Sequence, residues 1–197
     1  MRDLFKLFIA VVIFSGISGG VLAAVQNATK DRIEYQQLVF VKGPAINSIM
    51  EGCTNDPLQD RFKMKDQDKE RDFFVGEFDG KKNVVAFETY GKGFGGDIGV
   101  ITAVDVDTDK IIGVAVTTHS ETPGVGSKAK TDPGFGGQFE GKPITDVFKV
   151  KPDGGKIDAI SGATISSRGV AAAVAQSGEI YKRLKNDLKN KMKASQG

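Results

Sequence analysis

The hydrophobic and polar positions of this chain change their pattern along its length, and each pattern predicts a different element. The segment from Leu7 to Thr29 (LFIAVVIFSGISGGVLAAVQNAT) contains no charged residue. As a helix at about 1.5 Å per residue it would span roughly 35 Å, and the hydrocarbon core of a bilayer needs about 30 Å. We therefore expect residues 1–29 to form an N-terminal membrane anchor. The alternative is a cleaved signal peptide with Val21-Leu22-Ala23 as its cleavage site.

Polar residues dominate the next segment, residues 30–70, and its apolar positions are scattered. We expect this segment to be a polar connector that is helical in part. Its end is dense in charge: residues 62–72 read FKMKDQDKERD, which is typical of a solvated surface or a sheet edge. The connector is thus predicted to join the anchor to a folded domain.

From Phe73 onward the pattern becomes that of β-strands. Aromatic and β-branched residues form short runs that are bounded by Gly or Asp turns. Because the connections at Asp79-Gly80 and at residues 107–110 are short, the runs pair as hairpins and the sheet is antiparallel. The expected strands are Phe73–Phe78, Asn83–Tyr90, Ile98–Val106 and Ile111–Thr118.

The last predicted element is a long amphipathic helix from about Ile165 to Lys193. Apolar positions recur along it at spacings of three and four, while Lys and Arg fill the other side. Gly169 weakens this helix by about 1 kcal/mol relative to Ala, so we expect it to serve a close packing contact. The predicted fold class is α+β: a domain over residues 71–197 with an antiparallel β-sheet and packed helices, preceded by one transmembrane helix.

Composition narrows the chemistry that this domain can perform. The formal net charge is only +2, and the sequence has no basic stripe with interleaved aromatic residues, so nucleic acid is not an expected partner. Cys53 is the only cysteine and His119 the only histidine among the 197 residues. A disulfide within the chain and a Cys/His zinc or iron–sulfur site are therefore excluded. If the protein handles electrons, a flavin fits this restriction, because its chemistry resides in the cofactor.

Two short stretches carry candidate chemistry, and the first is the segment from His119 to Lys128 (HSETPGVGSK), which follows a predicted strand. Pro123-Gly124 predicts a tight turn with a left-handed glycine. Thr122, Lys128 and exposed amides would then face a polar ring edge or a phosphate. The alternative is a plain polar loop at the end of a strand.

The second stretch is the segment from Asp158 to Thr164 (DAISGAT), directly before the long helix. A helix start exposes free N–H groups and the positive end of the helix dipole, and both favour a bound anion. Thr164 offers a hydroxyl that a phosphate could esterify. The alternative is that Ser161 caps the helix. The residues alone leave both interpretations open.

Together these stretches resemble a known family. DAISGAT is similar to the Asp-x-x-Ser/Thr-Gly-Ala-Thr target of the flavin transferase that esterifies FMN onto threonine. HSETPGVGSK resembles the His-x-Glu-Thr-Pro-Gly-x-Gly segment of the same FMN-binding family, and residues 93–105 (GFGGDIGVITAVD) resemble its Gly-aromatic-Gly-Gly strand entry. The resemblance covers residues 73–180, with the motifs in the family's order. The family includes the G subunits of Rnf electron transport complexes, which the chain resembles more, and the C subunits of the sodium-pumping NADH:quinone oxidoreductase.

The resemblance implies covalently bound FMN. The phosphate of FMN would be joined to Thr164, which is then an attachment residue and not a catalytic nucleophile. Lys128 or Arg168 would offset the phosphate charge, and Asp158 would serve recognition by the transferase. The residues implied to bind the cofactor are Thr164, Ser161, Gly162, Ala163, Glu121, Thr122, Pro123, Gly124, Lys128 and Phe94.

The resemblance also implies a cellular role. The protein would be a non-autonomous electron-relay component of a membrane-bound, ion-translocating complex of the ferredoxin:NAD type, with other membrane subunits as partners. Because the flavin transferase works outside the cytoplasm, the soluble domain would lie on the extracytoplasmic side of the cell inner membrane, held by a single span. One alternative is a membrane-anchored or exported FMN-binding domain that serves a different reductase. Another is a cofactor-free adaptor subunit.

Overall fold

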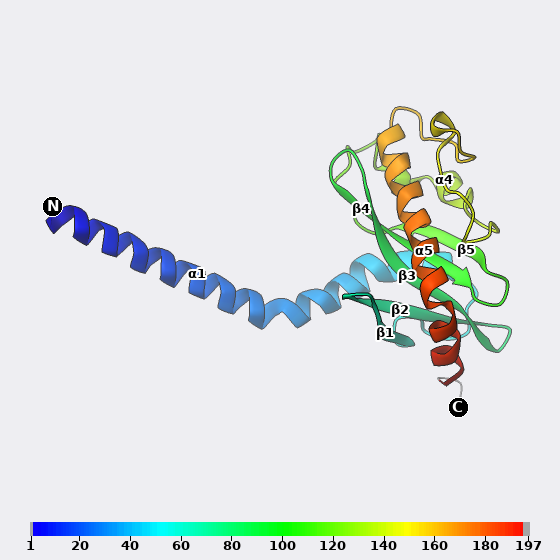
Figure 1. Cartoon of the computed structure of the whole chain (residues 1–197), viewed down its shortest axis with the longest axis horizontal. Helices are drawn as coiled ribbons and strands as arrows, with labels where there is room; N and C mark the ends of the chain where they lie inside the picture. The colour runs from blue at the N-terminus through cyan, green and yellow to red at the C-terminus, as the bar shows by residue number, and fades with distance from the viewer. Residues whose placement is uncertain (1, 195–197) are drawn as a thin grey trace. The chain divides into compact units, whose positions relative to one another are not determined.

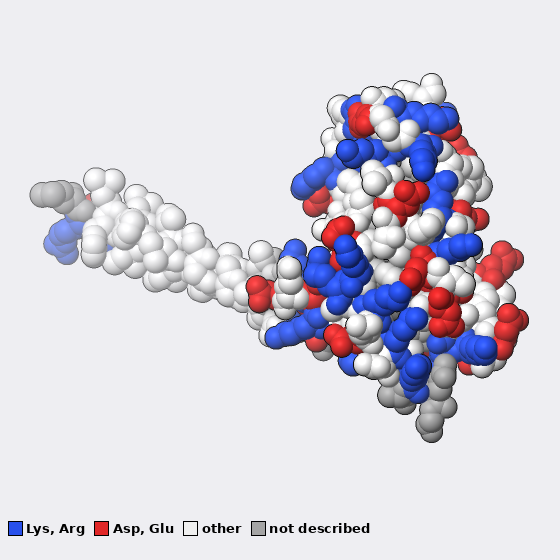
Figure 2. All heavy atoms as spheres, turned by 45° about the vertical axis from the view of Figure 1, so that its right-hand side comes forward, with Lys and Arg blue, Asp and Glu red and all other residues white. Residues whose placement is uncertain are grey.

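A computed structural model of the protein describes residues 2–194, and the chain divides into two compact units between Val39 and Phe40. The first unit consists of helix α1 (Arg2–Gln37) and the beginning of a π-helical turn, η1 (Leu38–Lys42). Residues 2–30 of α1 are long and apolar enough to cross a membrane, with a mean hydropathy of 2.3. Almost no charge is visible on the surface of this stretch in Figure 2.

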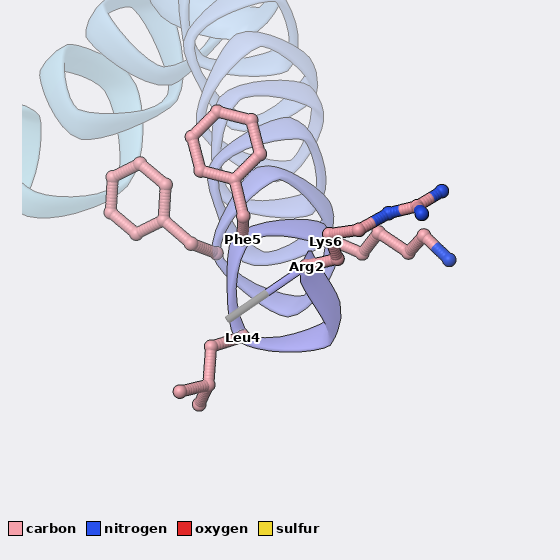
Figure 3. Close-up of a pocket in the computed structure, with 5 residues that line it drawn as sticks. Arg2, Leu4, Phe5 and Lys6 are labelled. Carbon is pink, nitrogen blue, oxygen red and sulfur yellow. The ribbon is translucent and has the colours of Figure 1, made fainter.

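Helix α1 continues beyond residue 29, where the anchor was expected to end. Residues 30–37 read KDRIEYQQ and contain neither Pro nor Gly, so nothing in the sequence stops the helix there. At its first turn Arg2 and Lys6 extend together from one side, whereas Leu4 and Phe5 point in other directions (Figure 3). The hollow that these side chains border is lined by residues of α1 alone.

The second unit contains a five-stranded antiparallel sheet in which spatial order follows chain order. Between the second and third strands, Asp79 and Gly80 have φ angles of 53° and 72°, as a two-residue type I′ hairpin turn requires. The predicted antiparallel sheet and α+β fold are confirmed. The strands are β1 (Arg61–Asp66), β2 (Lys69–Phe78), β3 (Lys81–Lys92), β4 (Asp97–Asp105) and β5 (Lys110–Val116).

Strand β1 lies within the segment that was expected to be a polar connector. Its apolar residues Phe62 and Met64 alternate with lysines and pack against the core, while the lysines are exposed. Within residues 2–194, strand β1 pairs only with β2. The charge-dense sequence is therefore the edge of the sheet.

The two faces of the sheet are covered by different elements. Helix α5 (Thr164–Ala194) lies across one face, as Figure 1 shows, and its apolar side joins the main hydrophobic core. The short helix α2 (Gly43–Ile49) covers part of the other face, where Ile49 lies directly against Gly113. The two-sided cover explains why the central strands are buried along most of their length.

Between β5 and α5 the chain forms only short helical pieces. Three aromatic residues of this segment, Phe135 in α4 and Phe139 and Phe148 in the irregular stretches after it, pack together and join the core on the α5 side. The pieces are α3 (Lys128–Thr131), α4 (Pro133–Gly137) and the 3₁₀ turn η2 (Lys151–Asp153).

Helix α5 approaches strand β3 so closely that only glycine fits at the crossing. A Cβ atom on Gly91 would lie 1.8 Å from the carbonyl oxygen of Gly169, and a Cβ atom on Gly169 would lie 2.7 Å from the carbonyl oxygen of Lys92. The expected packing role of Gly169 is therefore confirmed. The contact fixes the first turns of α5 beside the end of β3.

Candidate functional site

The stretch before α5 forms a tight turn. The amide of Ala163 donates to the carbonyl of Ile160 at 2.9 Å, and Gly162 has a φ of 75°, which fits a type II turn with glycine in its third position. The buried Ser167 hydroxyl accepts from the Ile160 amide at 2.9 Å and donates to the Ala163 carbonyl at 3.0 Å. Ser161 is exposed and forms no side-chain hydrogen bond among the described residues. Ser167, and not a Ser161 cap, braces the start of the helix.

Helix α5 begins at Thr164 with free hydrogen-bonding groups. The first amide that finds an acceptor one turn earlier is that of Ser167, which donates to Ala163 at 3.0 Å. Among the residues that the structure describes, the amides of residues 164–166 have no such acceptor. Thr164 is partly exposed, and within residues 2–194 its hydroxyl has no hydrogen-bond partner. An anion at this hydroxyl would face the positive end of the helix dipole.

The loop after β5 contains a second turn of the same kind. The amide of Val125 donates to the carbonyl of Thr122 at 3.2 Å, and Gly124 has a φ of 73°. Pro123 occupies the position that proline favours in a type II turn. The amide of Gly124 also donates to the Ser127 hydroxyl at 2.8 Å. The predicted left-handed turn is confirmed.

These two turns and the β3–β4 loop enclose a pocket of about 380 Å³. Its volume falls within the range of about 300–1,000 Å³ that is usual for small-molecule sites. Three segments that are far apart in the sequence meet there. The lining residues are Phe94 from the β3–β4 loop, Glu121, Thr122, Val125 and Gly126 from the loop after β5, and Gly162, Ala163, Thr164, Ile165 and Ser166 from the start of α5.

Some residues that were expected to bind a cofactor lie outside this pocket. Lys128 is exposed at the start of α3. Arg168 forms two hydrogen bonds of 2.7 Å to the carboxylate of Asp153. Asp158, expected to serve transferase recognition, is exposed and paired with Lys151 at 2.6 Å. The expected cofactor-binding residues that line the pocket are Phe94, Glu121, Thr122, Gly162, Ala163 and Thr164, and those that do not are Ser161, Pro123, Gly124 and Lys128.

Four lining residues were missed by the sequence interpretation. Val125 and Gly126 directly follow the Pro-Gly turn, and Ile165 and Ser166 directly follow Thr164. Val125 and Gly126 already lie within the segment His119–Lys128, and extending DAISGAT by two residues would have included Ile165 and Ser166. The sequence signal was therefore adjacency to a recognised turn.

The polar centre of the pocket is the buried carboxylate of Glu121. It accepts hydrogen bonds from the Gly95 amide at 2.7 Å and from the Ser166 hydroxyl. Burial by itself would raise the pKa of this carboxyl, yet the hydrogen bonds from Ser166 and from the amides of Gly95 and Phe94 hold that pKa below its ordinary value. Glu121 is therefore ionised at neutral pH.

The rim of the pocket is apolar. Phe94 is 71% exposed, Val125 41% and Ile165 46%, although side chains of this size are usually buried. Apolar side chains around a few polar groups are typical of a site for a flat organic ligand. Within the part of the chain that the structure describes, no group of three or more His, Cys, Asp or Glu residues could hold a metal ion. The arrangement favours an organic cofactor that bears a phosphate.

Comparisons with known proteins agree with this geometry. A family model described as the FMN-binding domain matches residues 93–178. The G subunit of the ion-translocating oxidoreductase complex of Cereibacter sphaeroides is 33% identical over 89% of this chain and 83% of its own length. The corresponding protein of Methanosarcina acetivorans is 30% identical over 88% of this chain and 92% of its own length.

Solved structures agree as well. The crystal structure of Shewanella oneidensis NqrC has a TM-score of 0.54 and 28% identity, and the match covers 71% of this chain and 72% of that one. The C subunit of the Na⁺-translocating NADH-quinone reductase of Parabacteroides distasonis has a TM-score of 0.52 and 30% identity, over 59% of this chain and 63% of that one. The chain therefore belongs to the family of the G subunits of ion-translocating oxidoreductase complexes, electron-transport proteins with an FMN-binding domain.

Proposed function

We propose that this protein is the electron-relay component of a membrane-bound, ion-translocating complex of the ferredoxin:NAD type, and that it carries FMN covalently through a phosphoester to Thr164. The observation that carries the proposal is the position of Thr164. Thr164 lines the 380 Å³ pocket at the start of α5, and among the described residues its hydroxyl has no hydrogen-bond partner. When bound, FMN supplies the capacity to accept and pass on electrons.

The residues of the pocket fit a phosphate-bearing flavin. A phosphodiester at Thr164 would keep one negative charge, which the free amides of the first turn of α5 favour. Lys128 lies outside the pocket and Arg168 is paired with Asp153. These amides would therefore stabilise the negative charge of the phosphate in place of the two cations. The apolar rim offers contact surface to the ring system.

The attachment reaction belongs to a flavin transferase acting on the extracytoplasmic side of the cell inner membrane. With FAD as donor, the Thr164 oxygen forms a bond to the phosphorus of the FMN half. The bond between the two phosphates of FAD breaks, AMP leaves and the hydroxyl proton is released. Asp158, exposed beside Lys151, is accessible to the transferase, and α1 holds the finished domain at the membrane as a single span.

Mass spectrometry of the Thr164 peptide from native membranes tests the attachment. We expect a mass increase of one FMN less water, and an unmodified peptide contradicts the proposal. The Thr164→Val variant should fold but lack covalent flavin. The Thr118→Val variant is the matched control, because it removes an exposed hydroxyl that does not line the pocket.

The alternatives predict other results. An FMN-binding domain that serves a different reductase would carry FMN on Thr164 but would purify from gently solubilised membranes without integral membrane subunits. A cofactor-free adaptor would be colourless after denaturation and precipitation. We expect a yellow precipitate and a set of co-purifying membrane subunits.

A further inference from the structure

The attachment reaction proposed above does not involve the buried carboxylate of Glu121. We propose that Glu121 is the positioning residue of the flavin pocket: it joins the Phe94 loop to the first turn of α5 and keeps a negative charge at the pocket wall that lowers the reduction potential of the bound FMN. The proposal rests on the function proposed above, because the second half of it needs a flavin in the pocket.

The side chain of Glu121 connects three segments of the chain, and we call its hydrogen bonds to Gly95 and Ser166 the joint. Gly95, in the β3–β4 loop, lies 26 residues from Glu121 in the sequence, and Ser166, in α5, lies 45 residues from it. Among the described residues, the Ser166–Glu121 hydrogen bond is the only one between the loop after β5 and the start of α5. Removing the carboxylate would leave those two walls of the pocket without a polar connection.

The surroundings of the carboxylate are shaped to hold it in one place. A Cβ atom on Gly93 would lie 2.4 Å from Glu121 Oε1, and a Cβ atom on Gly126 would lie 2.8 Å from Glu121 Oε2. Real Cβ atoms do not approach so closely, so both positions admit only glycine while Glu121 keeps this conformation. The space that Glu121 occupies, together with Ile98 at Gly93 and Ser166 at Gly126, accounts for these two glycines.

The carboxylate also keeps a charge that no Lys or Arg among the described residues neutralises, although the neighbouring His119 contributes to holding its pKa low. In the described part of the chain the hydrogen-bond donors to the carboxylate are the Ser166 hydroxyl and the amides of Phe94 and Gly95, and no Lys or Arg pairs with it. A charge in a partly enclosed pocket acts through a lower effective dielectric constant than a charge in water. Because it repels an electron that is added to the flavin, it favours the oxidised cofactor and lowers the reduction potential.

The Glu121→Gln variant separates charge from position. The amide oxygen of the new side chain still accepts from the backbone amides, and its nitrogen donates to the Ser166 hydroxyl, so the joint remains while the charge is lost. In the full-length, detergent-purified protein with attached FMN, we expect a shift of the midpoint potential to a more positive value. The control Asp97→Asn, which removes an exposed carboxylate on β4, should leave the potential unchanged. A potential of Glu121→Gln equal to that of the wild type would overturn the electrostatic role.

The Glu121→Ala variant removes both charge and joint. In a Thr164→Val background, where no covalent flavin is present, we expect Glu121→Ala to melt at a lower temperature than Glu121→Gln. Equal melting temperatures of the two variants would overturn the positioning role. This measurement needs no flavin, so an unmodified wild-type Thr164 would contradict the proposed function and not the joint.

Discussion

The start of α5 and the turn before α2 are held to opposite faces of the sheet by different physical means. On the α5 face the helix and β3 touch through glycine backbones, and the surrounding core is apolar. On the α2 face, Glu88 accepts hydrogen bonds from Thr117 Oγ1 at 2.5 Å and from Tyr90 at 2.7 Å, and pairs with Lys42 Nζ at 2.8 Å. Close backbone packing fixes the first turns of α5, whereas an ion pair fixes Lys42 in the turn before α2.

Removing the Glu88 carboxylate should have the largest effect on stability. Glu88→Ala removes a nearly buried carboxylate and leaves Lys42 without its partner, so we expect the free energy of unfolding to fall by about 3–5 kcal/mol. Denaturant unfolding of the full chain in detergent measures this value. Asp97→Ala is the control: it breaks an ion pair with Lys92 whose side chains are 56% and 86% exposed, and it should cost less than about 1 kcal/mol. Equal losses would show that the α2 face is not held by charge.

A methyl group at the glycine crossing should have the next largest effect. In Gly91→Ala the added Cβ atom would overlap the Gly169 carbonyl oxygen, and overpacking of this kind costs about 1–3 kcal/mol. Because the clash displaces the first turns of α5, we also expect less FMN on Thr164 by mass spectrometry. Gly137→Ala meets no atom within 4 Å and should change stability by less than about 1 kcal/mol. A fully flavinylated, stable Gly91→Ala protein would contradict the role of shape on this face.

The α5 face also contains two buried threonines that form a matched pair. The hydroxyl of Thr89 donates to the Ala173 carbonyl at 2.8 Å, whereas the hydroxyl of Thr102 has no partner in the described part of the chain. Thr89→Val should lower the free energy of unfolding by about 1 kcal/mol, and Thr102→Val should be neutral or stabilising. Thermal unfolding of the two variants side by side measures the difference, and the opposite order would contradict the assignment.

The smallest expected effect concerns the middle of α5, where Asp109, in the turn between β4 and β5, accepts from Lys185 at 2.5 Å and from Tyr181 at 2.7 Å. Burial by itself would raise the pKa of Asp109, but these hydrogen bonds hold that pKa below its ordinary value of 3.8. The stabilisation is therefore complete above about pH 3.8 and is lost as the pH falls through the folded-state pKa. Asp109→Asn should reduce the dependence of the free energy of unfolding on pH in the acidic range. Asp107→Asn, on the same turn, should leave that dependence unchanged.

The parts of the fold that the sequence predicted are those with local signals. Asp79-Gly80 specifies its hairpin because both residues accept positive φ, and the short connections leave an antiparallel sheet as the only solution. Strand β1 was not predicted because its apolar residues Phe62 and Met64 are surrounded by charged residues in the sequence. Its strand conformation depends on pairing with β2. A local pattern cannot report an interaction that forms across the sheet.

The same distinction between local signals and contacts made by the fold applies to the candidate site. Pro123-Gly124 and Gly162 could be assigned to turns because a left-handed glycine is a local requirement. The bond between Glu121 and Ser166 could not be predicted, because its partners are 45 residues apart and only the fold brings them together. Arg168 was expected to serve a phosphate, but it is paired with Asp153, 15 residues earlier in the chain.

The two type II turns that flank the pocket have a consequence for the timing of maturation. Both are specified by their own glycines, at Gly124 and Gly162, and each is closed by a backbone hydrogen bond of its own. The conformational entropy of these turns is therefore lost when the domain folds. In the proposed function, the binding of FMN would not have to supply that free energy, and the transferase would act on turns that folding has already ordered.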